Sequence, residues 1–478
     1  MFGIISPVVS GLMPVQAQSP RLAAKPVPKH PAAAFFVPQI SVSLRPIRHQ
    51  TGQALTSMLK HSRTLLSSLP DLTARLFGRA VDLSAQKQPR SPVRLEDFLS
   101  IPVAEHGRDE ADCARLRAHG QFLARQERWQ DLSDAIRAAD ATRETTEGGT
   151  PVADLLAFGA RSDVVLAVEE ALQDSHRTDQ APLIDGIRAL EFVRQDHPDD
   201  PYIALIVALT HIDLAWAWRG TGWDTIVPRL NREKCAAHFD RAIEILSPWC
   251  GVKMDSPILQ AACCALLAGR RTSQRRVADC YEALIDLDRH NSRHMRALGN
   301  HLLPRWFGSY AELELEARRT AARTQDIWGA GGYTWVYLDA IAQDEEACAR
   351  VDVDFFIDGL RDIARARPEQ ETINLLAAYC TVTLRGNIGL HEEADLNRMQ
   401  ICDAADWLIR DHLTEVHPMI WAHASEGFDN NMRVSSPSRF AARGRADALQ
   451  IIASLFRDEI RNGNRVVFTP EGPQLHGA

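Results

Sequence analysis

The stretch HNSRHMRALGNHLLPRWFGSYAELELEARR, residues 290–319, reads as two helices joined by a tight corner. Met295 and Leu298 belong to an apolar face at helical spacing in its first half. Pro304 ends the first helix, because proline lacks the backbone N–H that a helix needs. Ser309, with a glutamate three residues later, forms the capping box that begins the second helix. The stretch therefore predicts a helical hairpin.

Three histidines in the same stretch raise the alternative of a metal site. His290 and His294 lie one helical turn apart and could share an ion. His301 lies about 10 Å further along a straight helix, beyond the reach of one zinc ion with bonds of about 2 Å. Asn291 is also a good N-cap, which would leave His290 outside the helix. We therefore interpret the histidines as residues that border the apolar face of a packed helix, and keep His290 and His294 as the metal candidates.

Similar helix boundaries recur through residues 95–460. An N-cap residue precedes a proline at the first helical position in Thr150-Pro151, Asp200-Pro201 and Ser256-Pro257. Turns separated by 38 to 50 residues, about two helices and two turns, are predicted near Pro198, Pro248, His290, Ala330, Pro368 and Asp411. These features predict an all-α fold, an α-solenoid of stacked antiparallel helical hairpins. A strand is expected only at Arg465–Thr469, within an extended C-terminal tail over 461–478.

Two of the predicted helices carry a family resemblance. FDRAIEILSP (239–248) places a small residue three positions after an aromatic one, and both it and YEALIDLD (281–288) are followed by a turn. Both segments resemble the second helix of a tetratricopeptide repeat. PRWFGSYAELELEARR (304–319) resembles a PRW-x-GSY element of bacterial helical-repeat proteins. The likeness covers residues 185–410, and it implies binding of other proteins along a curved surface without catalytic residues.

Composition favours a globular protein of a reducing compartment. The 478 residues are 45% apolar and 24% charged, and no uninterrupted run of eighteen apolar residues predicts a transmembrane helix. Nine cysteines without a C-x-x-C pair are typical of free thiols. Residues 1–17 lack the basic start and unbroken apolar centre of a secretory signal. We expect a cytoplasmic protein; export through a weak N-terminal signal, or attachment at the inner membrane face, is the alternative.

The N-terminal region differs from the rest in charge. Residues 1–94 contain twelve basic and two acidic residues, a net charge of +10, and the remainder carries −18. Residues 1–49 are predicted to be a disordered basic arm, 50–83 one or two amphipathic basic helices, and 84–94 a linker. The amphipathic segment offers a membrane or partner face through Leu55, Met58, Leu59, Lys60, Arg63 and Leu66. Docking on the acidic body or a protein partner is favoured over an anionic membrane, and nucleic acid is least favoured.

A tryptophan-rich segment is the strongest candidate for a binding surface. HIDLAWAWRGTGWDTIVPRL (211–230) holds the four candidates Trp216, Trp218, Arg219 and Trp223. The alternative, which we favour, is that tryptophans fill the groove between neighbouring hairpins. Two other motifs have structural interpretations: WGAGGYTW (328–335) is predicted to be an inter-helix turn, and Asp352 or Asp354 to cap a helix.

The leading functional hypothesis is a non-enzymatic interaction or scaffold protein that binds a protein partner along its helical-repeat surface. No cofactor is expected. The alternatives are a peripheral membrane protein and an enzyme with a site assembled across hairpins. The enzyme, with or without a metal, would draw on His290, His294, Glu316 or His423. A second histidine group, His412, His417 and His423, has no predictable geometry because Pro418 interrupts it.

Overall fold

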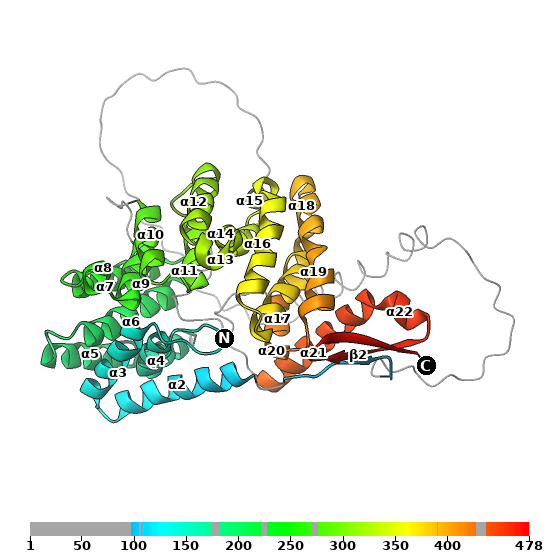
Figure 1. Ribbon diagram of the computed structural model, residues 1–478. Helices are drawn as coiled ribbons and strands as arrows, with labels where there is room; N and C mark the ends of the chain where they lie inside the picture. Colours follow the sequence, from blue (N-terminus) through cyan, green and yellow to red (C-terminus); the bar gives the residue numbers. More distant parts are fainter. Residues whose placement is uncertain are drawn as a thin grey trace, which may run out of the picture. The chain divides into compact units, whose positions relative to one another are not determined.

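The computed structural model describes residues 97–104, 107–173, 181–220, 227–269, 276–389, 391–426 and 436–477. These residues are mostly helical, as the sequence predicts (Figure 1). The predicted arm (1–49), the amphipathic segment (50–83) with its candidate residues, the linker (84–94) and Trp223 lie outside the described residues.

The first half of the described chain contains α2 (Arg108–Arg125), α3 (Trp129–Thr142), α4 (Val152–Gln173), α5 (Ala181–Asp196), α6 (Pro201–Arg219), α7 (Arg229–Leu246), α8 (Gly251–Met254), α9 (Pro257–Ala265), η2 (Leu266–Gly269), α10 (Val277–Leu287) and α11 (Ser292–His301). The second half contains α12 (Tyr310–Arg323), α13 (Gln325–Trp328), α14 (Gly331–Gln343), α15 (Glu345–Arg350), α16 (Val353–Ala366), α17 (Gln370–Ala378), η3 (Tyr379–Thr383), η4 (Arg385–Asn387), α18 (Glu392–Cys402), α19 (Ala404–Trp407), η5 (Leu408–His412), α20 (Pro418–Glu426), α21 (Pro437–Leu455) and α22 (Arg457–Arg461).

Most of the predicted helix starts are confirmed by their caps. Asp200 accepts hydrogen bonds from two backbone N–H groups at the start of α6, and Ser256 accepts one at the start of α9. Asn291 caps α11 and Ser309 caps α12. Asp352 caps α16. Gly329 has the positive φ predicted for a glycine of the inter-helix turn, but the prediction of a turn over 328–335 is too long, because α14 already begins at Gly331.

The prediction of Thr150 as an N-cap is wrong. The Pro151 carbonyl accepts from the Leu155 N–H, so α4 begins one residue later, at Val152. Pro151 itself forms an isolated antiparallel bridge with Thr145, and the Thr146 N–H donates to the Thr150 carbonyl. These bonds hold the segment before α4 in an extended conformation.

Helices that are neighbours but one in sequence pack closely at glycine. A side chain on Gly120 of α2 would clash with the Leu156 carbonyl of α4, and one on Gly159 of α4 would clash with the Arg117 carbonyl. Gly299 of α11 meets the Val336 carbonyl of α14, which follows α12 and the short α13, in the same way. The two backbones approach closely because glycine has no Cβ.

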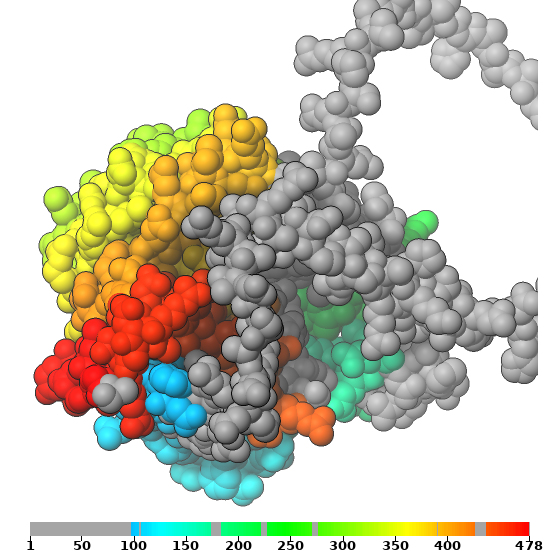
Figure 2. Space-filling view, turned by 90° about the vertical axis from the view of Figure 1, so that its right-hand side faces the viewer, coloured from blue at the N-terminus to red at the C-terminus, as the bar shows by residue number. Residues whose placement is uncertain are grey.

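The C-terminal tail forms part of a small sheet. The predicted strand is β2 (Asn464–Thr469), which pairs antiparallel with β3 (Gly472–Gly477) and parallel with β1 (Leu99–Ser100). The order is β1-β2-β3, and Figure 2 shows the blue residues at the start of the described chain beside the red C-terminal residues. Val466 and Phe468 are buried, with Phe468 edge-on to Phe456. The tail therefore belongs to the same core as the helices before it.

One helix of the described residues, α6, is long and apolar enough to cross a membrane by length and composition alone. Within the apolar window of this helix, 78% of the residues are buried inside the protein. A core helix of a soluble protein passes the same test, so this finding is weak evidence for a membrane span.

Candidate functional site

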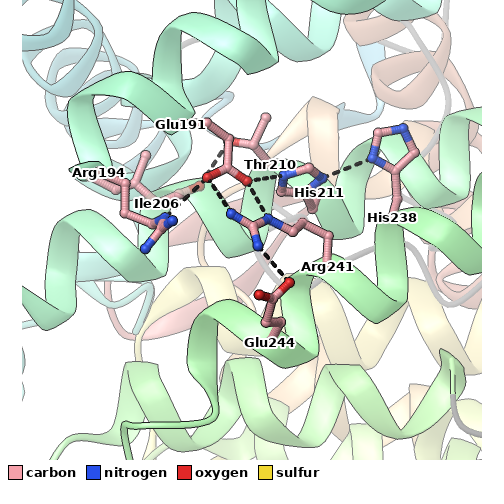
Figure 3. Close-up of polar contacts among 8 residues, drawn as sticks. All are labelled: Glu191, Arg194, Ile206, Thr210, His211, His238, Arg241 and Glu244. Atoms are coloured by element: carbon pink, nitrogen blue, oxygen red, sulfur yellow. Dashed lines mark hydrogen bonds and ion pairs between the residues drawn. The ribbon is translucent and has the colours of Figure 1, made fainter. Parts of the chain in front are cut away.

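A highly connected polar cluster of the described residues lies between α5, α6 and α7 and is centred on Glu191 (Figure 3). Arg241 donates two hydrogen bonds to the Glu191 carboxylate, from Nε to Oε1 at 2.6 Å and from Nη2 to Oε2 at 2.9 Å. Arg194 Nε donates to Oε2 at 3.1 Å, and His211 Nε2 lies 3.1 Å from Oε1. His211 Nδ1 in turn lies 2.9 Å from Nδ1 of His238. We call these five residues the Glu191 cluster.

The protonation states in the Glu191 cluster follow from its contacts. Burial alone would raise the pKa of Glu191, but hydrogen bonds from His211, Arg241 and Arg194 hold that pKa well below its ordinary value. Burial lowers the pKa of His238 to about 4, and electrostatic interactions with its neighbours His211 and Lys234 act in the same direction. His238 is therefore neutral at pH 7, and one of the two facing Nδ1 atoms donates while the other accepts.

A carboxylate that orients one histidine against a second is an arrangement that acid–base sites use. Two arginines already neutralise the Glu191 carboxylate, however, and His238 Nδ1 faces a ring nitrogen in place of a hydroxyl or thiol nucleophile. The bonds of Glu191 instead join one helix to two others. The arrangement is therefore well suited to fixing α5 against α6 and α7.

The histidines of the opening stretch are placed differently from one another. His290 is exposed, whereas His294 and His301 are buried at 3% and 5% exposure. His301 Nδ1 lies within hydrogen-bonding distance of the Tyr281 hydroxyl and the Ala297 carbonyl. The border position predicted for these histidines is thus wrong for two of them, which lie inside the core. Among the described residues, no group of three histidine, cysteine, aspartate or glutamate side chains is arranged to hold a metal ion.

The tryptophan-rich segment is divided between the core and the surface. Trp216 is buried and packs edge-on to Phe239 of α7 and to Trp306, the residue at the corner after α11. Trp216 therefore fills a groove between helices and leaves little of its side chain exposed to a partner. Trp218 is only partly buried, and Arg219 Nη1 donates to the Gly220 carbonyl at the end of α6.

The other candidates of the enzyme hypothesis have separate sets of partners. Glu316 of α12 is buried and paired with Arg276 and Arg319. His423 of α20 packs edge-on to Phe440, and burial lowers the pKa of His423 to about 4.

Two small recesses lie among the described residues. His417 and His423 line a recess of about 30 Å³, together with Glu110 and Met419. His417 Nε2 lies 2.9 Å from Glu415 and its Nδ1 lies 3.6 Å from Glu371. A second recess of about 20 Å³ is lined by residues that include Asp154 and His294. Both volumes suit a water molecule or two and are far below the roughly 300 Å³ of a substrate pocket.

Glu191 and Asp154 were not singled out from the sequence. Asp154 lies in the apolar run VADLLAFGA, and His211 lies in the apolar run of α6. A polar residue inside an apolar helix is a usable signal, because burial there requires a partner. Glu191 gives no such signal, since two of its partners, His211 and Arg241, come from other helices.

Comparison of the chain with the models of known protein families, with curated proteins and with solved structures finds no match.

Proposed function

We propose that this chain is a helical-repeat interaction protein, an α-solenoid of stacked helical hairpins that binds a protein partner along its surface. The proposal places the binding in exposed side chains of successive helices and assigns no catalytic residue.

The observation that carries the proposal is the recurring sequence separation of several hydrogen bonds that join helices lying two or more elements apart along the chain. Arg125 of α2 bonds to Asp163 of α4, 38 residues away. Arg276 bonds to Glu316 of α12 across 40 residues. Arg296 of α11 bonds to Asp339 of α14, and the His417 N–H to Asn374 of α17, each across 43 residues. These separations match the repeat length of about forty residues that two helices and two turns require.

The direction of the helices agrees with the same arrangement. Along α2 and α4, Arg117 lies beside Gly159 and Arg125 beside Asp163, so the two helices run parallel with α3 between them. At the start of α10, Arg276 pairs with Glu312, and near its end Asp286 pairs with Arg323, so α10 and α12 also run parallel. In a stack of hairpins every second helix is parallel, and each unit contacts its neighbours.

The size of the recesses gives further support. Two recesses among the described residues have volumes of about 30 and 20 Å³. The Glu191 cluster uses its hydrogen-bonding groups to connect α5, α6 and α7. Repeat proteins commonly use extended surfaces in place of deep pockets, and such surfaces suit a protein partner.

We expect Trp218 and Arg219 to contact the partner, and substitutions at these two residues test the proposed binding. Partly buried tryptophan beside arginine is the composition of binding hot spots. The Trp218 carbonyl accepts from Asn231 Nδ2 at 2.8 Å, and truncation of the side chain leaves that link between α6 and α7 in place. The variant Trp218→Ala with Arg219→Ala therefore probes binding and keeps the hydrogen bond from Asn231 that joins the two helices.

The experiment is affinity purification of the full chain with mild cross-linking, followed by reconstitution of any stoichiometric partner from purified components. We expect a partner that binds the wild type and Phe192→Ser, a control at an exposed apolar residue of α5, but binds W218A/R219A at least about tenfold more weakly. A chain lacking residues 1–94 tests whether the basic arm contributes. Recovery of no stoichiometric partner with either chain would overturn the proposal.

The alternatives have separate readouts. A stoichiometric metal in protein purified without chelator favours the enzyme. Flotation with anionic liposomes that is lost on deletion of residues 51–82 favours a peripheral membrane protein.

A further inference from the structure

The recess beside Asp154 combines a buried carboxyl group with a buried histidine nitrogen that has no hydrogen-bond partner among the described residues. It lies where the end of α3, the start of α4, the start of α9 and the turn before α11 meet. Its cavity volume is about 20 Å³, and the empty space reaches about 340 Å³ when the part open to solvent is included. Its charged and polar lining is Asp140, Arg143, Glu144, Asp154, Asp288, Asn291 and His294.

Two of the acids in this lining differ in their hydrogen bonds. Asp140 is fully engaged: Tyr202 and Ser256 hydroxyls donate to Oδ2, and the Ile258 N–H donates to Oδ1. Asp154 is 8% exposed, and no hydrogen bond reaches its carboxyl group from the residues that the structure describes. Burial raises the pKa of Asp154 to about 7, against the opposing charges of Arg293 and Arg161.

His294 supplies a buried donor on the same recess. The Asn291 side chain is oriented, because its Oδ1 accepts from the Arg293 N–H. Asn291 Nδ2 therefore donates to His294 Nε2, at 3.2 Å. Burial lowers the pKa of His294 to about 3, so the ring is neutral and carries its proton on Nδ1. That Nδ1 is buried and has no hydrogen-bond partner in the structure.

Within the described part of the chain, the recess has a histidine N–H without an acceptor and a carboxyl group without a hydrogen bond, and these two groups define the chemistry of a ligand that would fit it. The N–H requires an acceptor, since a buried donor without one costs free energy. The charges of Asp140 and Asp288 oppose the ionisation of Asp154, whereas those of Arg293 and Arg161 favour it, and a cation in the recess would act in the same sense as the two arginines. The acceptor should be neutral, because four acids and one arginine line the recess and a second carboxylate would be repelled.

We propose that this recess binds a primary ammonium group with a neutral oxygen acceptor on the adjacent carbon, the chemistry of an amino-acid amide, a 2-amino alcohol or a polypeptide N-terminus. The ammonium group, about the size of a water molecule, enters the enclosed volume and contacts Asp154. The neighbouring carbonyl or hydroxyl oxygen accepts from His294 Nδ1. The remainder of the ligand points through the opening to solvent.

The test uses four small probes on the full chain, with ethanolamine added to identify the source of the ligand, and binding is followed by calorimetry and by chemical-shift changes. Glycinamide has both groups, ethylamine lacks the acceptor, acetamide lacks the cation and glycine replaces the neutral acceptor by a carboxylate. We expect saturable binding of glycinamide, and binding of each other probe at least about tenfold weaker, the effect of one lost hydrogen bond or one repulsive charge. Glycinamide binding also supports a polypeptide N-terminus as the source, and ethanolamine binding of equal strength supports an amino alcohol.

A variant confirms the location. Asp154→Asn removes the charge and should fold, because the ionised side chain is buried without a hydrogen bond. It should weaken glycinamide at least about tenfold, whereas Asp163→Asn on the exposed face of α4 should leave binding unchanged. Three outcomes would each overturn the proposal. They are ethylamine that binds as tightly as glycinamide, Asp154→Asn that binds glycinamide as tightly as the wild type, and a recess that holds only water at a high concentration of glycinamide.

Discussion

The Glu191 cluster and the Asp154 recess each place an acid in an environment with little water, and they resolve the cost of burial in opposite ways. Glu191 accepts from two arginines and a histidine, which hold its pKa well below the ordinary value. Asp154 has no such bond among the described residues, and burial raises its pKa to about 7. Removing the charge should therefore destabilise one region and stabilise the other. The hydrogen bonds of Glu191 hold three helices together, whereas the groups without partners beside Asp154 indicate where another molecule could bind.

The largest expected effect is at Asp154. Asp154→Asn should raise the free energy of unfolding by about 3 kcal/mol at pH 8, because the wild type has an ionised carboxylate whose folded pKa is raised from 3.8 to about 7. The unfolded chain loses that proton first, so the wild-type penalty grows as pH rises from 3.8 to about 7 and is absent below 3.8. The extra free energy of unfolding of the variant should therefore decrease as pH falls from about 7 to 3.8. Urea unfolding of both proteins at several pH values measures it, and a gain independent of pH would contradict the prediction.

At Glu191 the sign is reversed. Glu191→Gln should lower the free energy of unfolding by about 2 kcal/mol, because the bidentate bond to Arg241 and the bonds from Arg194 and His211 lose a charged acceptor at a side chain only 16% exposed. Urea unfolding at pH 7 measures the loss. Glu233→Gln, in the exposed pair with Arg229 on α7, is the matched control and should change little. Equal effects of the two variants would show that Glu191 does not fix α5 to α7.

His238 gives the Glu191 cluster a pH dependence opposite to that of Asp154. Its folded pKa of about 4 lies below the unfolded value of 6.5, so the unfolded chain takes up the proton first as pH falls. Its contribution to stability is present above pH 6.5 and is lost between pH 6.5 and about 4. His238→Gln should reduce that acid loss by about 1 kcal/mol, since the side chain is partly exposed. An NMR titration of the His238 ring with a midpoint near 6.5 would falsify this account.

The smallest effect is expected at the edge of the same cluster. Glu244 pairs with Arg241 Nη1 at 2.5 Å, but its side chain is 69% exposed. Glu244→Gln should change the unfolding free energy by only a few tenths of a kcal/mol, as exposed ion pairs do. A thermal or urea midpoint close to that of the wild type is the expected result. A loss of unfolding free energy as large as that of Glu191→Gln would show that Arg241, and not Glu191, is the central residue of the cluster.

Much of the local structure follows from the sequence, because caps, turns and apolar spacing act within a few residues. Asp200, Ser256, Asn291 and Ser309 begin helices where they were predicted to, and the strand at 465–469 is present. Thr150 shows the limit of this reasoning. Its backbone takes part in an extended segment paired with Thr146, and a local cap rule does not anticipate such pairing.

Only the tertiary structure decided which polar residues meet. The stretch 290–319 by itself determines two helices and a corner, since each signal lies within one turn of the helix that it begins or ends. It does not determine that His294 is buried beside Asp154, 140 positions earlier, or that Glu191 meets His211 and Arg241 from two other helices. Charged side chains meet across helices whose approach is set by backbone contacts such as Gly120 with Leu156. Burial and charge at these sites are properties of the packed structure, because neither exists until the helices pack together.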